Sequence, residues 1–348
     1  MVIWVPIAAF VPAAILCASL LPLFRRLFLV VPGARSSHVQ ATPQGGGLVV
    51  VPVAILVAFG AQIGAEGVRP DGFAWSLVGA LGLLAALGAW DDLRPLGAAF
   101  RFLVQAAAAA LALAATPRDF ASILWFVPGP LVAAAALIGM LWLINLTNFM
   151  DGIDLMTVSQ FVPAFATVYA LLAGLDGPPQ WVGALCLACA GALAGFALMN
   201  RPRARLFLGD SGSLPLGLLA AVALLVVAGA RGLAPALLPF LYYIADATLT
   251  LLRRLVAGER FWQAHRDHFY QRANRAGLSV WQVIARVAAC NVTLCALALL
   301  SAGQPAVAQT AALAAGAAAV ALLLVELGRR RLPQTAAMVA PSIAEPRE

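Results

Sequence analysis

The sequence contains no lysine and carries little charge of either sign. Charged residues make up 11% of the 348 residues, whereas soluble domains usually carry about 25%. Hydrophobic residues make up 63% of the chain. So little charge excludes an ordinary soluble domain, and the composition predicts an integral membrane protein.

Cysteine is also scarce, and the five cysteines all lie in apolar runs without a histidine or carboxylate nearby in the sequence. Cys186 and Cys189 have the spacing of a metal or redox motif, but small residues on a lipid-embedded helix more often pack. We therefore expect neither disulfides nor zinc. Basic stripes interleaved with aromatic residues are missing too, so no nucleic-acid partner is expected.

Apolar runs recur along the chain, and most approach the ~20 residues that a helix needs to cross a bilayer. They are too long for the alternating strands of about 10 residues in a membrane barrel. We predict an all-α, polytopic transmembrane bundle of ten or eleven helices, forming one domain over 1–331 with a disordered cytoplasmic tail over 332–348. The fourth run is short, so ten spans plus one re-entrant piece also fit. The eleven candidate spans are about 2–24, 47–65, 73–90, 102–115, 122–144, 159–175, 181–199, 214–229, 233–252, 283–302 and 307–327.

The loop arginines predict the orientation, because basic loops stay on the cytoplasmic side. With the amino terminus outside and the carboxyl terminus in the cytoplasm, the outer connections hold only Arg69, Arg118 and Arg231. Most acidic residues then also fall at the inner ends of the spans. The polar chemistry is therefore expected at the cytoplasmic face.

Two polar motifs at that face precede the middle of the chain. "ARSSHVQATPQGGG", 34–47, includes His38 and ends in glycines that allow a sharp bend or a close approach to a ligand. In "WDDLRP", Asp91 and Asp92 oppose the dipole at the end of the third span, so the fold gains no stability from them. Two adjacent carboxylates suit Mg²⁺. Taken by itself, the motif also fits a solvated acidic turn beside Arg94 that has no metal.

The stretch "NLTNFMDGIDLM", 145–156, places four polar side chains at helical spacing at the inner end of the fifth span. Gly152 interrupts that helix. Amides suit a pyrimidine or sugar, and the carboxylates suit a metal or a ribose. Polar groups at a membrane boundary are costly, which favours a functional role. The four residues are Asn145, Asn148, Asp151 and Asp154.

Two further inner motifs combine arginines with other polar groups. "NRPRARLFLGDSGS" joins three arginines to a glycine turn around Asp210, and both arginine forks and helix amino termini suit phosphate oxygens. "HRDHFYQR" holds His265 and His268 in a basic loop that suits an anion. Asp246, one helix earlier, is expected to organise this loop through Arg253 or Arg254. Together the motifs indicate divalent-metal chemistry on a phosphate.

These motifs, in this order, resemble the polyprenyl-phosphate N-acetylhexosamine-1-phosphate transferases of glycosyl transferase family 4. The family includes the phospho-MurNAc-pentapeptide transferase and the initiating enzymes of common-antigen and O-antigen synthesis. The resemblance implies a multi-pass enzyme of the bacterial inner membrane that moves a HexNAc-1-phosphate from a UDP-sugar to undecaprenyl phosphate. It implies Mg²⁺, with Mn²⁺ as a substitute, and a homodimer as a further candidate assembly. The "HRDHFYQR" motif is similar to the corresponding motif of O-antigen initiating enzymes that use UDP-linked 2-acetamido-6-deoxyhexoses.

Carried over by motif, the resemblance assigns roles to residues of this chain. Asp91 or Asp92 is implied to deprotonate or orient the lipid phosphate, and Asp210 and Asp91 to hold the metal. Asp151 and Asp154 are implied to act in the site, with Asp154 near the uracil. The implied substrate contacts are His38, Asn145, Asn148, Asn200, Phe207, His265, Arg266 and His268.

This chain departs from the family at two places. Ser36 and Ser37 precede His38, so the usual lysine of the first loop is absent or replaced by Arg35. Leu155 stands where a glycine is usual. Direct attack by the lipid phosphate and a covalent aspartyl intermediate both fit this chemistry. A cation- or proton-coupled transporter is the alternative from another class, but it predicts carboxylates near the membrane midplane.

Overall fold

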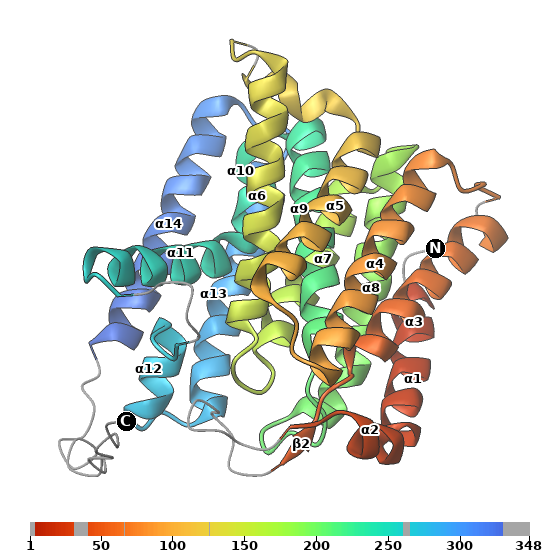
Figure 1. Ribbon diagram of the computed structural model, residues 1–348. Coiled ribbons are helices and arrows are strands. Elements are labelled where there is room, and N and C mark those ends of the chain that lie inside the picture. The colour runs from red at the N-terminus through yellow and green to blue at the C-terminus, as the bar shows by residue number, and fades with distance from the viewer. Residues whose placement is uncertain (1–3, 31–40, 66, 125, 260–264, 330–348) are drawn as a thin grey trace.

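A computed structural model of the chain describes residues 4–30, 41–65, 67–124, 126–259 and 265–329. His38 and the predicted tail, 332–348, lie outside the described residues. The helices stand side by side in one bundle (Figure 1). In chain order the elements are α1 (Trp4–Ser19), α2 (Leu21–Leu27), β1 (Leu29–Val30), β2 (Thr42–Pro43), α3 (Gly47–Gly60), η1 (Ala61–Ala65), α4 (Gly72–Leu93), α5 (Ala98–Ala115), η2 (Arg118–Leu124), α6 (Gly129–Met150), α7 (Met156–Leu172), α8 (Pro178–Asn200), α9 (Asp210–Arg231), α10 (Leu233–Leu237), η3 (Leu238–Phe240), α11 (Leu241–Val256), α12 (Phe269–Arg275), α13 (Val280–Ser301) and α14 (Ala306–Gly328).

Each of the eleven predicted spans overlaps a helix, although the fifth, 122–144, begins in η2 and continues in α6. Within the described residues nine helices are long and apolar enough to cross a membrane, and the α1–α2 pair, bent by 54°, brings the number to ten. Helix α7 is apolar but shorter. The fourth run, which looked short in the sequence, is a full helix of 18 residues. The chain is a multi-pass helical membrane protein.

The ninth predicted span, 233–252, is not one straight helix. It is divided into α10, η3 and α11, and α11 runs across the bundle instead of along it (Figure 1). Pro239 lies in η3 and has no N–H to donate to a preceding turn, which favours a break there. Its carbonyl accepts a hydrogen bond from Gln160 Nε2 at 2.7 Å. A side chain of helix α7 therefore supplies a donor to the carbonyl at the break.

Helix α9 lies at the centre of the bundle. It packs against α4 and α6, and also contacts α3, α8 and α10. Most of its side chains are buried. Large apolar side chains such as Leu56, Ile138 and Leu322 are instead exposed on other helices, as expected for surface that faces lipid.

A short antiparallel pair of strands, which the sequence did not predict, connects the first polar loop to the loop before α9. Val30 pairs with Thr42 in β1 and β2. Phe207 N donates to Pro43 O at 2.9 Å, and Gly46 N and Gly47 N donate to the carbonyls of Phe207 and Leu208 at 2.9 and 2.8 Å. These backbone bonds hold the glycine loop against the segment that leads to Asp210.

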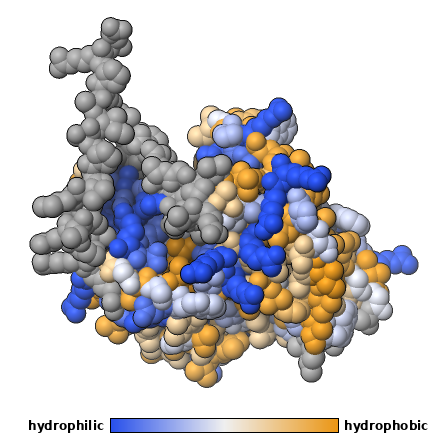
Figure 2. Space-filling model, turned by 90° about the horizontal axis from the view of Figure 1, so that it is seen from below, coloured by the Kyte–Doolittle hydropathy of each residue, from blue (hydrophilic) through white to orange (hydrophobic). Residues whose placement is uncertain are grey.

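The loops predicted to face the cytoplasm meet at one end of the bundle, the lower end in Figure 1. Figure 2 looks at this end and shows hydrophilic residues across its middle, with hydrophobic surface towards the sides. The shared end agrees with the alternation of the predicted spans. The assignment of this end to the cytoplasm stays a prediction.

Candidate active site

A polar cavity of about 270 Å³ lies among the loops at this end. It gathers residues from segments that are far apart in the sequence: β1, the end of α6, the loop before α9 and α12. Predicted site residues from two motifs meet here. Its lining residues include Asn148, Asp151, Gly152, Asn200, Phe207, Asp210, Ser213 and Gln271.

A second cavity, of about 560 Å³, lies between α5 and α6 and is mainly apolar. Phe102, Leu141 and Trp142 supply apolar wall, and Arg101 gives it a cationic group. Asn148 and Asp210 line both cavities. The polar and the apolar cavity therefore meet at these two side chains.

Asp210 is the first residue of α9, and its side chain is fixed from α6. Asn148 Nδ2 donates to Asp210 Oδ1 at 2.6 Å and to Ser213 Oγ at 3.0 Å. Asp210 Oδ2 lies 3.9 Å from Arg101 Nη1. One carboxylate oxygen is thus held by an amide, while the other faces a cation at the mouth of the apolar cavity.

Asp91 forms an ion pair with Arg101, a residue that the sequence motifs did not single out. Arg101 Nη1 donates to Asp91 Oδ2 at 2.7 Å, and Leu96 N donates to Asp91 Oδ1 at 2.7 Å. Because Arg101 also faces Asp210, it connects the two carboxylates that were predicted to hold metal.

Asp92 caps helix α9 from a neighbouring helix. Its Oδ1 accepts from Asp210 N at 3.1 Å and its Oδ2 from Ser211 N at 3.3 Å. The first N–H groups of a helix have no partner within the helix, and a carboxylate there also interacts favourably with the helix dipole. Asp92 therefore positions Asp210, and its two oxygens are both engaged.

Three glycines allow this close packing. A Cβ at Gly88 would lie 2.2 Å from the Asp210 carbonyl carbon, and a Cβ at Gly47 would lie 2.1 Å from Gly212 N. The backbones of α3 and α4 therefore press directly on the start of α9. Larger side chains at these glycines would displace Asp210.

Gly88→Ala is expected to destabilise the protein by about 1–3 kcal/mol, because its methyl group overlaps backbone that has no room to move. Gly82, on the same helix, has no atom within 4 Å of an added Cβ. Gly82→Ala should be neutral or slightly stabilising, since alanine is the better helix former. Thermal unfolding of both purified variants in detergent measures the difference. Equal shifts for the two variants would contradict the packing described here.

The "NLTNFMDGIDLM" stretch divides into residues that face the polar cavity and residues that hold its loops. Asp151 lines the cavity and accepts from Thr157 Oγ1. Asp154 is buried, and its Oδ2 accepts from Arg203 N at 3.0 Å and Ala204 N at 3.2 Å. Asp154 thus braces the loop before α9, and it does not line the polar cavity.

Leu155 has a left-handed backbone conformation, with φ of 63°. Glycine adopts this conformation freely, whereas other residues pay about 1–2 kcal/mol. The turn is nevertheless fixed, because Leu155 N donates to Asn200 Oδ1 at 2.8 Å and the leucine side chain is buried. The chain therefore keeps a glycine-type turn without the glycine.

Asn145 and Asn200 hold parts of the site together. Asn145 lines the apolar cavity, and its Nδ2 donates to Gln105 Oε1 and Leu141 O, both at 2.8 Å. Asn200 lines the polar cavity beside Phe207, and its Nδ2 donates to Leu206 O at 3.0 Å.

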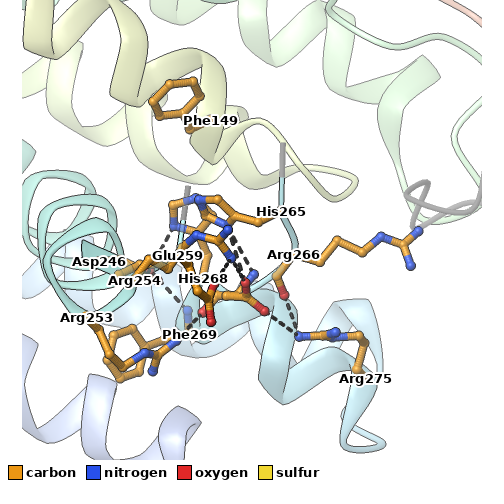
Figure 3. Close-up of polar contacts among 12 residues, drawn as sticks. Phe149, Asp246, Arg253, Arg254, Glu259, His265, Arg266, His268, Phe269 and Arg275 are labelled. Atoms are coloured by element: carbon orange, nitrogen blue, oxygen red, sulfur yellow. Dashed lines mark hydrogen bonds and ion pairs between the residues drawn. The ribbon is translucent and has the colours of Figure 1, made fainter. Parts of the chain in front are cut away.

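The histidine loop forms a separate cluster between α11 and α12 (Figure 3). Asp246 is fully buried there, and its Oδ1 accepts from Phe269 N at 3.1 Å and lies 3.3 Å from His268 Nδ1. The expectation that Asp246 works through Arg253 or Arg254 was wrong. These arginines instead contact Asp267, because Asp246 points into the bundle.

The anion-binding role of this loop stays a prediction, and its positive charge would come from the arginines and not from His265. Burial, with His268 and Arg254 nearby, lowers the pKa of His265 to about 4, so this imidazole is neutral at pH 7. Arg266 points away from the other labelled polar groups in Figure 3. Neither cavity is lined by His265, Arg266 or His268 among the residues described.

The carboxylates at the junction fit a weakly held divalent cation. Asp91 and Asp210 offer only oxygen ligands, as Mg²⁺ prefers, and Arg101 supplies one balancing charge. Among the described residues no three His, Cys, Asp or Glu side chains are arranged to hold a metal by themselves. Mg²⁺ commonly uses one or two carboxylates together with substrate phosphate and water, so the donor set suits that mode.

Known proteins match this chain over its core. Residues 74–228, which include Asp91, Asn148 and Asp210, match "Glycosyl transferase family 4". The decaprenyl-phosphate N-acetylglucosaminephosphotransferase of Mycolicibacterium smegmatis is 30% identical over 290 residues, covering 71% of this chain and 69% of the relative. The probable undecaprenyl-phosphate N-acetylglucosaminyl 1-phosphate transferase of Bacillus subtilis is 25% identical over 287 residues, covering 78% of each chain.

A phospho-N-acetylmuramoyl-pentapeptide-transferase of Synechococcus sp. is 33% identical over 228 residues, covering 59% of this chain and 64% of the relative. The similarity thus reaches members that are named for different sugars, and the family match includes Asn148 and Asp210, which line both cavities. The chain belongs to glycosyl transferase family 4.

Proposed function

We propose that this protein transfers a HexNAc-1-phosphate from a UDP-sugar to undecaprenyl phosphate and releases UMP. The names of its relatives, which pair a polyprenyl phosphate with N-acetylglucosamine phosphate, support this reaction. We place the reaction at the cytoplasmic face of the bacterial inner membrane, where it would start a lipid-linked glycan such as an O-antigen. A 2-acetamido-6-deoxyhexose is included among the proposed donor sugars.

The observation that carries the proposal is the meeting of the two cavities at Asn148 and Asp210. A water-soluble donor needs polar walls, and a polyprenyl acceptor needs apolar ones. The reacting phosphates must come together where the two kinds of wall meet. A transporter would have no need for an apolar cavity beside its carboxylates, so the junction favours the transferase.

The side chains at and beside the junction are proposed to have different roles. Arg101 lines the apolar cavity and is suited to orient the acceptor phosphate, since arginine binds phosphate oxygens in pairs. Asp91 holds Arg101 in place, and Asp92 fixes the backbone of Asp210. Asp210 and Asp91 would hold Mg²⁺, which when bound reduces the negative charge of the donor diphosphate.

In the proposed reaction an oxygen of the lipid phosphate forms a bond to the β-phosphorus of the donor. The bond from that phosphorus to the bridging oxygen breaks, and UMP is the leaving group. A covalent aspartyl-phosphate route gives the same products in two displacements. A phosphorylated protein after mixing with donor alone would identify the second route.

The direct test uses membranes that contain the protein, undecaprenyl phosphate and a panel of radiolabelled UDP-sugars. We expect a lipid-linked product from at least one UDP-HexNAc, lost with EDTA and restored by Mg²⁺ or Mn²⁺. Membranes without the protein serve as the control. The absence of such a product from every UDP-HexNAc would refute the proposal.

A further inference from the structure

Gln271 is a buried amide in the wall of the polar cavity. It lies on α12, only 7% of it is exposed, and it lines the cavity together with Asp151, Asn200 and Phe207. Its Oε1 is buried and has no hydrogen-bond partner among the described residues. A buried carbonyl without a hydrogen-bond partner destabilises the fold, so an unpaired Oε1 in a cavity wall points to a ligand as its partner.

The other amides of the cavity differ from Gln271 in this respect. Asn148 donates to Asp210 and Ser213, and Asn200 donates to Leu206 O and accepts from Leu155 N. Their hydrogen-bonding groups already hold the protein together. The Gln271 oxygen is therefore a cavity acceptor that the described residues leave unpaired, whereas the asparagines mainly shape the wall.

The position of Gln271 is fixed by close packing. A Cβ at Gly152 would lie 2.6 Å from Gln271 Nε2 and 2.3 Å from the hydroxyl oxygen of Tyr270. The glycine lets α12 approach the loop that follows α6, and this contact places the amide at the cavity. An amide presents a donor and an acceptor side by side, so its matching partner is a group with an N–H beside a C=O.

We propose that Gln271 recognises the donor through such an edge. This proposal rests on the proposed function and adds a specificity residue to it. A UDP-HexNAc carries this edge in the imide of its uracil. The trans acetamido group of the sugar points its N–H and its C=O in opposite directions, so it can pair with only one of the two groups of the amide. The uracil is therefore the part of the donor that matches the unpaired amide.

The test measures binding of UMP, UDP-glucose and UDP-GlcNAc to the purified protein by calorimetry. Gln271→Met keeps the length of the side chain and removes the amide. We expect affinity to fall about tenfold, the loss of a paired hydrogen-bonding group. If uracil is the partner, all three ligands weaken equally. A loss confined to UDP-GlcNAc would instead place the amide on the sugar and would overturn the pairing with uracil.

Gln160 provides a matched control. It is fully buried in α7, its Oε1 also lacks a partner among the described residues, and it does not line the polar cavity. Gln160→Met should leave the three affinities within twofold of the wild type. Gln271→Met affinities that stay within twofold, or the same loss in both variants, would overturn the inference.

Turnover by the wild-type protein separates this inference from the proposed function. A wild type that binds the nucleotides through Gln271 but forms no lipid-linked product would refute the proposed function alone. A wild type that forms product, with Gln271→Met affinities unchanged, would refute the role of Gln271 alone.

Discussion

Asp210→Asn is expected to reduce the rate of lipid-linked product formation by about 1,000-fold, a loss typical of removing a group that stabilises developing charge. Asparagine keeps the shape of the side chain and can still accept from Asn148 Nδ2, as Asp210 Oδ1 does at 2.6 Å. The fold should therefore survive, while the charge at the junction of the cavities is lost. Initial rates with radiolabelled UDP-GlcNAc in membranes measure the effect.

Asp176→Asn is the control for this variant. Asp176 lies in the loop between α7 and α8, away from both cavities. Its replacement should leave the rate and the thermal unfolding temperature unchanged. A well-folded Asp210→Asn protein that retains more than a tenth of the wild-type rate would show that the Asp210 charge is not needed.

Arg101→Met is expected to lower kcat/KM for the lipid acceptor by about 100-fold, because it removes the cation at the end of the apolar cavity. The loss should fall on the acceptor, whereas KM for the UDP-sugar should change little. Methionine retains much of the apolar length of the side chain. Rates at varied undecaprenyl phosphate, at saturating donor, provide the measurement.

Arg94→Met is the control for Arg101→Met, since Arg94 follows the same acidic pair but is exposed and lines neither cavity. It should behave like the wild type. Arg101→Lys should restore only part of the rate, because a lysine lacks the planar fork of arginine. A rise in KM for the UDP-sugar instead of the acceptor would place Arg101 on the donor side.

The helices could be predicted from the sequence because a long apolar run in a bilayer must hydrogen-bond its own backbone groups, and a helix does so within one segment. Helix α5 illustrates the limit of such predictions: the run from 102 looked short, but the helix begins at Ala98 and includes Arg101. An arginine at the edge of a span looks like part of the positive-inside bias. Its contact with Asp91 depends on how α5 folds back after α4.

The membership of the site was partly predictable, but the contacts within it were not. Asp210 and Asn148 were expected in the site and lie at its centre. Asp92 and Asp154 were expected to act on substrate, yet they accept hydrogen bonds from backbone N–H groups of distant segments. Local spacing cannot distinguish these roles, because the partners are brought together only by packing.

Gln271 was also not predicted, for the same reason. In the sequence it is one polar residue in a loop dominated by histidine and arginine. Only its burial, its unpaired oxygen and its contact with Gly152 distinguish it from its neighbours. Asp246 was recognised as the organiser of that loop, but its partners depend on the direction in which α11 turns after η3.

Because Asn148 and Asp210 are the wall that the two cavities share among the described residues, the proposed substrates would approach from different phases. A nucleotide sugar diffuses in water, and a polyprenyl phosphate diffuses within the membrane, so neither has to pass through the other's binding place. Each could bind first, and each product could leave without waiting for the other. In kinetic terms, such a site suits a random order of addition, in which UMP competes with the nucleotide sugar and not with the lipid.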